Sequence, residues 1–123
     1  MSPDGILIVE DHEDIRILLK KTLAGIAGEL VFAPTAEEAR KQLSKRRFRL
    51  ILLDISLPEM DGTEVLRRID ADPLLRGIPV IALTAHAMAG DREAFLAAGF
   101  DEYITKPIID EHILLDTIAR FLA

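Results

Sequence analysis

The fold is decided at residues 50–54, which read Leu50-Ile51-Leu52-Leu53-Asp54. Four consecutive large aliphatic residues are typical of a strand that other parts of a protein cover on both faces. Two further segments have the same form, a continuous apolar run that stops at a polar side chain. They are Ile6-Leu7-Ile8-Val9, followed by Glu10, and Val80-Ile81-Ala82-Leu83, followed by Thr84. The sequence therefore predicts buried strands at all three places.

Longer amphipathic stretches separate these runs. Apolar residues recur there with the spacing of a helix, and we expect helices over residues 15–26, 35–45, 63–69, 88–98 and 113–122. Thr35 is placed to cap the second helix, with Glu38 three residues later completing a capping box. Two weaker strand patterns lie at 29–33 and near Tyr103-Ile104. Strands and helices thus alternate along the whole chain.

Parallel strands need long crossover connections, and helices supply them here. We therefore expect an α/β fold, a flavodoxin-like doubly wound sheet of five parallel strands in the order 2-1-3-4-5 with helices on both faces. The 123 residues are too few for a closed barrel of eight such units. They predict a single domain spanning 1–123.

Composition excludes several classes of function. The chain has 21 acidic and 15 basic residues, a net charge of −6 and no cysteine, so cysteine nucleophiles and thiolate zinc sites are absent. The acidic balance disfavours nucleic acid as a partner, and Arg46, Arg47 and Arg49 predict only a solvated end of the second helix. No apolar run is long enough to span a bilayer. The amino-terminal stretch is no secretory signal, and we expect a soluble, cytoplasmic protein.

In open sheets of this class, ligands bind beyond the carboxyl ends of the strands. The predicted strands end in Glu10 and Asp11, in Asp54, in Thr84 and in Lys106. Clustered carboxylates repel each other, and a hard divalent cation relieves that repulsion. A hydroxyl and an ammonium group suit the remaining oxygens of a phosphoryl group. The set predicts Mg²⁺ together with a phosphoryl group, and a carboxylate as the candidate nucleophile.

Other sites fit the sequence less well. The first predicted strand is not followed by a glycine-rich loop, which excludes a P-loop and a dinucleotide-binding fingerprint. A flavin phosphate would meet the acidic residues that follow this strand, where it needs hydrogen-bond donors. His12, His86 and His112 lack the spacing of a transition-metal site, and we expect His12 to be a loop residue.

Four motifs together resemble the receiver domains of two-component response regulators. They are Ile6-Leu7-Ile8-Val9-Glu10-Asp11, Leu52-Leu53-Asp54-Ile55-Ser56-Leu57-Pro58-Glu59-Met60-Asp61-Gly62, Leu83-Thr84-Ala85-His86-Ala87-Met88 and Tyr103-Ile104-Thr105-Lys106-Pro107. Each motif is weak by itself, but the four follow the order and spacing of the family over nearly the whole chain. The resemblance is greatest to stand-alone receivers and to those of hybrid kinases.

The resemblance implies a role for each matching residue. Asp54 is similar to the phosphoacceptor, which takes a phosphoryl group from a phosphohistidine on a partner and becomes an aspartyl phosphate. Asp11 is similar to a direct ligand of Mg²⁺, and Glu10 to the neighbouring acid that holds the waters of the ion, with Glu replacing the commoner Asp. Lys106 would bind a phosphoryl oxygen, and Ser56 would offer its backbone carbonyl to the ion.

The same resemblance implies a conformational switch. Thr84 is similar to the hydroxyl that swings toward the phosphoryl group, and Tyr103 to the aromatic residue that then moves inward. Ser56 and His86, two residues beyond Asp54 and Thr84, stand where the family tunes hydrolysis of its own phosphate. The face made by the fourth helix, fifth strand and fifth helix would be the output surface.

The implied partners are a histidine kinase or a histidine phosphotransfer domain, docking near the first helix, and a downstream protein target. Neither nucleic acid nor membrane is expected to bind, and we expect a monomer or weak dimer. The protein would be a regulator that assists only its own phosphorylation and dephosphorylation. Two alternatives stay open, a constitutive scaffold and a metal-dependent phosphohydrolase. The last helix closes at Phe121-Leu122-Ala123 without a linker, which favours a stand-alone regulator over a piece of a longer one.

Overall fold

The structure, a computed structural model, describes residues 5–24, 29–55, 62–73, 75, 77–85, 91–106 and 111–122. Its strands are β1 (Gly5–Val9), β2 (Glu29–Ala33), β3 (Leu50–Asp54), β4 (Val80–Thr84) and β5 (Glu102–Thr105). Its helices are α1 (Glu13–Leu23), α2 (Ala36–Lys45), α3 (Gly62–Ala71), α4 (Asp91–Ala98) and α5 (Glu111–Leu122). The strands pair in parallel in the order β2-β1-β3-β4-β5, as the sequence predicted.

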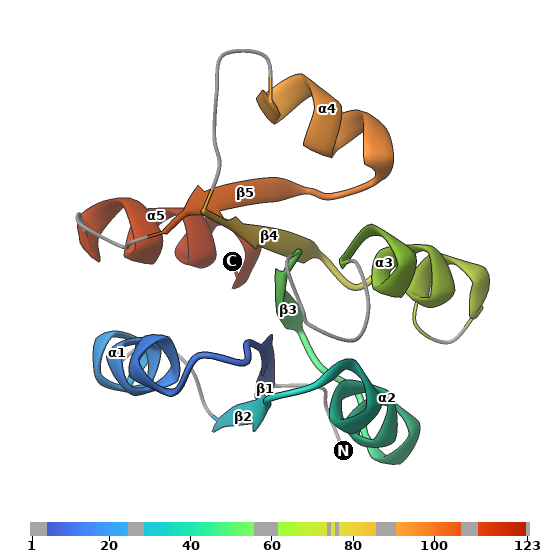
Figure 1. The fold of residues 1–123 in the computed structure, drawn as a ribbon, viewed down its shortest axis with the longest axis horizontal. Coiled ribbons are helices and arrows are strands. Elements are labelled where there is room, and N and C mark those ends of the chain that lie inside the picture. Colours follow the sequence, from blue (N-terminus) through green and yellow to red (C-terminus); the bar gives the residue numbers. More distant parts are fainter. Residues whose placement is uncertain are drawn as a thin grey trace.

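Helices cover both faces of this sheet (Figure 1), with α1 and α5 on one side and α2 and α3 on the other. Because side chains alternate along a strand, each buried run supplies both cores. Leu7, Ile51 and Ala82 pack on the side of α2 and α3. Ile8 and Leu52 pack on the side of α1 and α5. This double burial explains why the central strands are apolar throughout rather than alternating.

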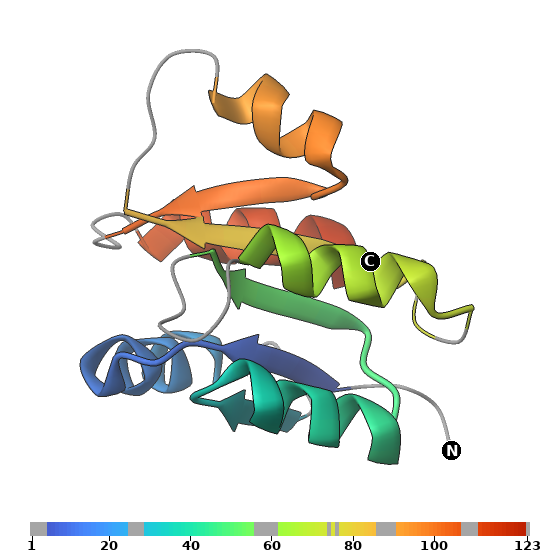
Figure 2. The ribbon, with the colours of Figure 1, turned by 45° about the vertical axis from the view of Figure 1, so that its right-hand side comes forward.

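Helix α4 lies beside the edge strand β5, as Figure 2 shows most clearly. Its Phe95 ring meets buried Phe100 edge to face, with the ring centroids 6.0 Å apart. The same ring lies 5.4 Å from that of Tyr103 on β5. Gly99 ends the helix with a φ of +114°, a conformation that glycine adopts without strain. The aromatic contacts thus join α4 to the strand that precedes Lys106.

The element boundaries agree closely with the sequence patterns. Thr35 caps α2 as predicted, because its Oγ1 accepts a hydrogen bond from the Glu38 amide at 3.1 Å. Helix α1 begins at Glu13, earlier than predicted, because two acids in its first turn suit the positive end of the helix dipole. Its last described turn ends at Leu23. The predicted continuation to residue 26 and the predicted start of the fourth helix at residue 88 lie outside the described residues.

The amino edge of the sheet, where the strands begin, holds the arginine cluster. Arg47 and Arg49 are exposed, as expected of a solvated helix end. Arg46 is different, because its guanidinium lies 5.0 Å from the ring centre of buried Phe48 and pairs with Glu29 at 3.0 Å. Arg49 donates a hydrogen bond to the carbonyl of Leu122 at the end of α5. Arg46 therefore ends the helix in partial contact with water, as predicted, and has in addition a stacking contact that the sequence did not predict.

No helix in the described parts of the chain is both long enough and apolar enough to cross a membrane.

Candidate functional site

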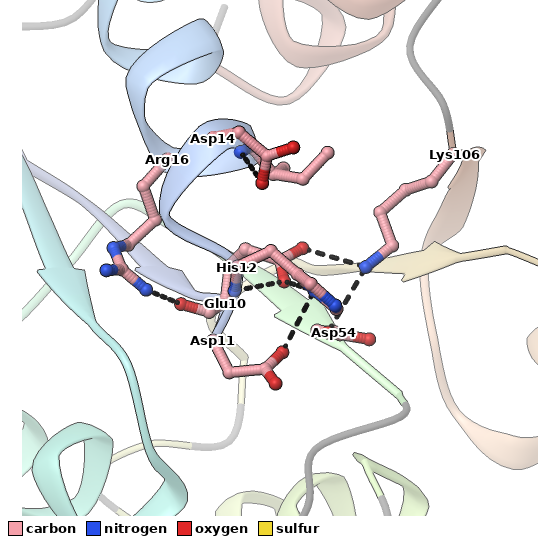
Figure 3. A network of polar contacts seen from close by, with 8 residues as sticks. Glu10, Asp11, His12, Asp14, Arg16, Asp54 and Lys106 are labelled. Atoms are coloured by element: carbon pink, nitrogen blue, oxygen red, sulfur yellow. Dashed lines mark hydrogen bonds and ion pairs between the residues drawn. The ribbon is translucent and has the colours of Figure 1, made fainter.

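The carboxyl edge of the sheet, where the strands end, gathers buried charges around Lys106. Its Nζ lies 3.0 Å from Oε1 of Glu10, which follows β1, and 3.2 Å from Oδ2 of Asp54, which ends β3. Both carboxylate side chains are completely shielded from solvent, and the lysine side chain is only 9% exposed. Figure 3 shows the ammonium group reaching between the two acids. The residue directly after β5 thus connects the ends of β1 and β3.

Backbone hydrogen bonds fix these strand ends relative to one another. The Lys106 amide donates to the carbonyl of Thr84 at 2.7 Å, and the Ile55 amide donates to the carbonyl of Leu83 at 3.1 Å. Arg16, one turn into α1, donates from Nη1 to the backbone carbonyl of Glu10 at 2.9 Å. Hydrogen bonds at the strand ends therefore hold the backbone that carries the cluster, and a site built on strands is positioned more precisely than one built on loops.

Burial and hydrogen bonding shift the pKa of Glu10 in opposite directions. Burial is the largest influence and raises the pKa of this carboxyl, and the charge of Asp54 raises it further. Hydrogen bonds from His12 and Lys106 lower it, but the net pKa stays above the ordinary value. Burial by itself would lower the pKa of Lys106, yet the hydrogen bond to Glu10 and the charges of both acids leave it raised. Lys106 is therefore a positively charged group that contacts two carboxyl groups, Glu10 and Asp54.

Asp11 and His12 complete the cluster on its open side. His12 Nδ1 lies 2.9 Å from Glu10 Oε2 and 3.2 Å from Asp11 Oδ1, and the ring is 56% exposed. The hydrogen bond to Glu10 and the charge of Asp11 raise the pKa of His12. Asp11 Oδ1 is shielded from solvent and accepts no hydrogen bond, so its contact with His12 is an ion contact only. A buried oxygen without a hydrogen bond is costly unless something else satisfies it.

The two predicted switch residues come from the neighbouring strands β4 and β5. Thr84 is buried at the end of β4, and its backbone carbonyl accepts the hydrogen bond from Lys106. Tyr103 is half-buried and pairs with Ala82 in the register of β4 and β5. Because side chains alternate along strands, Thr84 and Tyr103 lie on the same face of the sheet. That face carries α2, α3 and the Phe95 ring.

The predicted roles of Ser56 and His86 fall on residues outside the described part of the chain. His12 is a residue of the cluster that the sequence interpretation missed, since it was placed in a loop and set aside for its spacing to other histidines. The structure puts it at the N-cap position of α1, where its side chain does not cap the helix. Its position directly after Glu10 and Asp11, at the carboxyl edge, was the signal that could have identified it.

The residues present fit a hard divalent cation. Glu10, Asp11, His12 and Asp54 each offer one ligand atom, and these four atoms lie within 4.8 Å of one another. Three of the four are carboxylate oxygens, which Mg²⁺ prefers. The buried Asp11 oxygen that accepts no hydrogen bond would gain a partner from such an ion.

Comparisons with known proteins identify a family for the chain. The family model of the response regulator receiver domain matches residues 6–119. The polar-differentiation response regulator DivK of Brucella anthropi is 41% identical over 120 residues, covering 98% of this chain and 97% of DivK. The signal transduction histidine-protein kinase BarA of Escherichia coli K12 is 34% identical over 108 residues. That match covers 88% of this chain but only 12% of the kinase.

A solved structure is similar to this chain over nearly its whole length. The receiver domain of a sensor histidine kinase from Pseudomonas aeruginosa PAO1 superimposes with a TM-score of 0.83 at 32% identity, covering 98% of both chains. Its crystal structure has a magnesium ion coordinated in the active site cleft.

The fold and the cluster of acids around a lysine define a phosphoacceptor regulator of the two-component type. The chain belongs to the response regulator receiver domain family, whose general function is a phosphorylation switch.

Proposed function

We propose that Asp54 is the phosphoacceptor of this receiver domain and that residues 1–123 act as one such domain. The observation that carries the proposal is the buried contact of Asp54 Oδ2 with Lys106 Nζ at 3.2 Å, beside fully buried Glu10. A carboxylate at the end of a central strand is held in place by the sheet and has a cation beside it. This is the arrangement that a nucleophile for phosphoryl transfer needs.

The transfer step follows from these positions. A carboxylate oxygen of Asp54 forms a bond to the phosphorus of a phosphohistidine, and the bond from phosphorus to the imidazole nitrogen of the partner breaks. The electron pair of that bond stays on the imidazole, which leaves. Lys106 then exchanges its contact with the carboxylate for one with a phosphoryl oxygen, since its ammonium group can turn on a flexible stem. The chain assists only this transfer and the later hydrolysis of the aspartyl phosphate, in which water takes the phosphoryl group as inorganic phosphate and the Asp54 carboxylate is regenerated.

Glu10, Asp11 and Asp54 would hold Mg²⁺, with the backbone carbonyl of Ser56 as a further ligand. When bound, Mg²⁺ supplies positive charge to the phosphoryl oxygens during transfer. The support is the donor set and the buried Asp11 oxygen that accepts no hydrogen bond. Glu10 is completely buried and already bonded to Lys106, which suits the role of an acid that holds water on the ion.

Thr84 and Tyr103 would relay the change. The Thr84 hydroxyl moves toward the phosphoryl group, and Tyr103 moves inward along the same face of the sheet. The ring contact between Tyr103 and Phe95 of α4 supports this route, because movement of Tyr103 must repack α4. The surface of α4, β5 and α5 would then present a different shape to a downstream protein. Ser56 and His86 would tune how long the phosphorylated state lasts.

The phosphoryl donor would be a histidine kinase or a histidine phosphotransfer domain, docking near α1 beside the site. The downstream target is a protein. A cytoplasmic location and a monomeric or weakly dimeric state stay predictions from the sequence.

The test is phosphorylation by acetyl phosphate in the presence of Mg²⁺, measured by retardation on a phosphate-affinity gel. The parent protein is expected to give one acid-stable, base-labile phosphorylated species. Asp54→Asn is expected to abolish it, because the amide cannot act as the nucleophile. Asp116→Asn, which changes an exposed acid on α5, is the matched control and should be phosphorylated like the parent.

Equal phosphorylation of the Asp54→Asn variant would overturn the assignment. Beryllofluoride provides a second measurement that needs no covalent step, since it mimics a phosphoryl group on a carboxylate. In the parent, it should shift the amide resonances of Thr84 and Tyr103 in NMR spectra. The same spectra of Asp54→Asn should not change.

A further inference from the structure

His12 brings a nitrogen donor to a cluster that otherwise offers only carboxylate oxygens. Its Nδ1 lies 2.9 Å from Glu10 Oε2 and 3.2 Å from Asp11 Oδ1. In Figure 3 the imidazole ring turns toward the acids rather than toward the first turn of α1. The absence of a capping hydrogen bond from this N-cap residue agrees with that orientation. The His12 ring thus contacts the acids of the cluster and does not accept a capping hydrogen bond from the first turn of α1.

Lys106 divides the cluster into two parts. It occupies Oε1 of Glu10 and Oδ2 of Asp54, and its positive charge opposes a second cation on those atoms. Asp11 Oδ1 is buried and accepts no hydrogen bond, and it faces His12 instead of the lysine. The oxygen that most needs a cation therefore lies beside the only imidazole among the described residues of the cluster.

The spacing of the four ligand atoms suits one ion. Their largest separation is 4.8 Å. Around an ion with bonds of about 2.1 Å, donors stand roughly 3 to 4.2 Å apart. The set must therefore contract by only about half an ångström, and His12 is 56% exposed, so its ring has room to make that movement.

The nitrogen donor changes which ions such a site favours. Mg²⁺ takes oxygen ligands and gains little from imidazole, whereas the first-row ions from Fe²⁺ to Zn²⁺ bind imidazole well. We propose that His12 Nδ1 is a direct ligand of first-row transition ions in this cluster, so that the site binds them through Asp11 and His12 as well as Asp54. The inference rests on the proposed function, because the same cluster holds the Mg²⁺ used there.

The test compares the parent with His12→Asn, which keeps a polar side chain of similar reach. Titration calorimetry with Co²⁺ at about pH 8, above the ordinary pKa of imidazole, gives the affinity. Loss of groups that only orient a metal ligand costs about 10- to 100-fold, so loss of a direct donor is expected to weaken Co²⁺ binding at least about tenfold. Affinity for Mg²⁺ should change less than about twofold.

Coordination is read directly from electron spin echo spectra of the protein loaded with Cu²⁺, a paramagnetic ion that imidazole suits. The parent is expected to show modulation from an imidazole nitrogen, and His12→Asn should lose it. His112→Asn, at an exposed position on α5, is the matched control and should keep both the modulation and the Co²⁺ affinity.

The outcomes separate this inference from the proposed function. If the parent binds Mg²⁺ and beryllofluoride but His12→Asn keeps the modulation and the Co²⁺ affinity, the role of His12 is refuted and the phosphoacceptor assignment stands. If the modulation and the Co²⁺ affinity depend on His12 while beryllofluoride does not bind, the metal ligand stands and the proposed function fails. An equal loss of Mg²⁺ and Co²⁺ affinity in His12→Asn would also refute the inference, because His12 would then act on the whole site rather than as a nitrogen ligand.

Discussion

The two edges of the sheet differ in how far their charged side chains are buried and in how these charges are paired. At the amino edge, Arg46 pairs with Glu29 at 3.0 Å, and both side chains stay in contact with water. At the carboxyl edge, Glu10 and Asp54 are completely buried and share one lysine. An exposed pair of opposite charges is nearly neutral in its effect on stability, whereas two buried acids on one cation carry an uncompensated charge.

The difference indicates that the charges of the amino edge stabilise the fold, whereas those of the carboxyl edge serve a chemical function. Nothing in the packing of the sheet requires carboxylates at the ends of β1 and β3, since apolar residues would bury there at less cost. The amino edge fixes the corner between α2 and β3 by stacking and one-to-one contacts. The carboxyl edge keeps an excess of acid that only a cation relieves. Substitutions at the two edges should therefore differ in size, in sign and in their response to pH.

The largest effect is expected from Lys106→Met, which removes the cation between two buried acids. Breaking a buried ion pair from one side costs several kcal/mol, and we expect a loss of about 3 kcal/mol in the free energy of unfolding at neutral pH without divalent ions. Urea denaturation followed by circular dichroism measures it. The loss should shrink as the pH falls through the raised pKa of Glu10, which lies above the ordinary value of 4.5, because a protonated Glu10 no longer needs the lysine.

Mg²⁺ should also restore part of the stability that Lys106→Met loses, since it supplies another cation to the same acids. Lys20→Met changes an exposed lysine on α1 and is the control, expected to behave like the parent. A Lys106→Met variant as stable as the parent at neutral pH would mean that repulsion and burial of the acids in the cluster do not destabilise the protein.

A smaller effect of opposite sign is expected from Glu10→Gln. Burial raises the pKa of Glu10 in the folded protein above its unfolded value. The folded state therefore binds the proton more tightly, and stability falls as the pH rises from 4.5 through the raised pKa. Glutamine resembles the protonated acid and should make the protein more stable than the parent at neutral pH without divalent ions.

Thermal unfolding of Glu10→Gln and the parent across pH checks this. The advantage of the variant should disappear below pH 4.5, where both side chains are neutral, and should also decrease when Mg²⁺ is added to the parent. A variant less stable than the parent at neutral pH would show that the contacts of Glu10 with Lys106 and His12 outweigh its burial.

The smallest effect is expected from Glu29→Gln at the amino edge. The hydrogen bond from Arg46, followed by its charge, lowers the pKa of Glu29. Its contribution to stability is therefore present above pH 4.5 and is lost as the pH falls through the lowered pKa. Glu29→Gln should lower the melting temperature slightly at neutral pH and not at all in strong acid. A loss as large as that of Lys106→Met would remove the contrast between the edges.

Most of the fold was predictable because the signals were local and repeated. The apolar runs at β1, β3 and β4 are buried along their whole length, as continuous hydrophobicity predicts. The Thr35 cap also follows from residue type and spacing alone. The proximity of Glu10, Asp54 and Lys106 was predictable because the carboxyl ends of parallel strands all lie at one edge of the sheet.

What could not be predicted depended on the direction of single side chains. His12 lies in a loop in sequence terms, and only the path of the chain between β1 and α1 turns its ring toward Asp11. Arg46 belongs to a basic cluster, yet the buried Phe48 ring gives it a surface on which to stack. Neither direction follows from periodicity, since both residues stand where regular structure is interrupted.

Lys106 donates its backbone amide to Thr84 at 2.7 Å and its ammonium group to Asp54 at 3.2 Å. One residue therefore carries both a hydrogen bond between neighbouring strand ends and the contact that, under the proposed function, changes partners when Asp54 is phosphorylated. We expect this amide proton to exchange slowly with solvent while Lys106 contacts the carboxylate, and its exchange rate to change when the lysine moves to a phosphoryl group. Hydrogen exchange at a single backbone amide directly after β5 would then report the occupancy of Asp54.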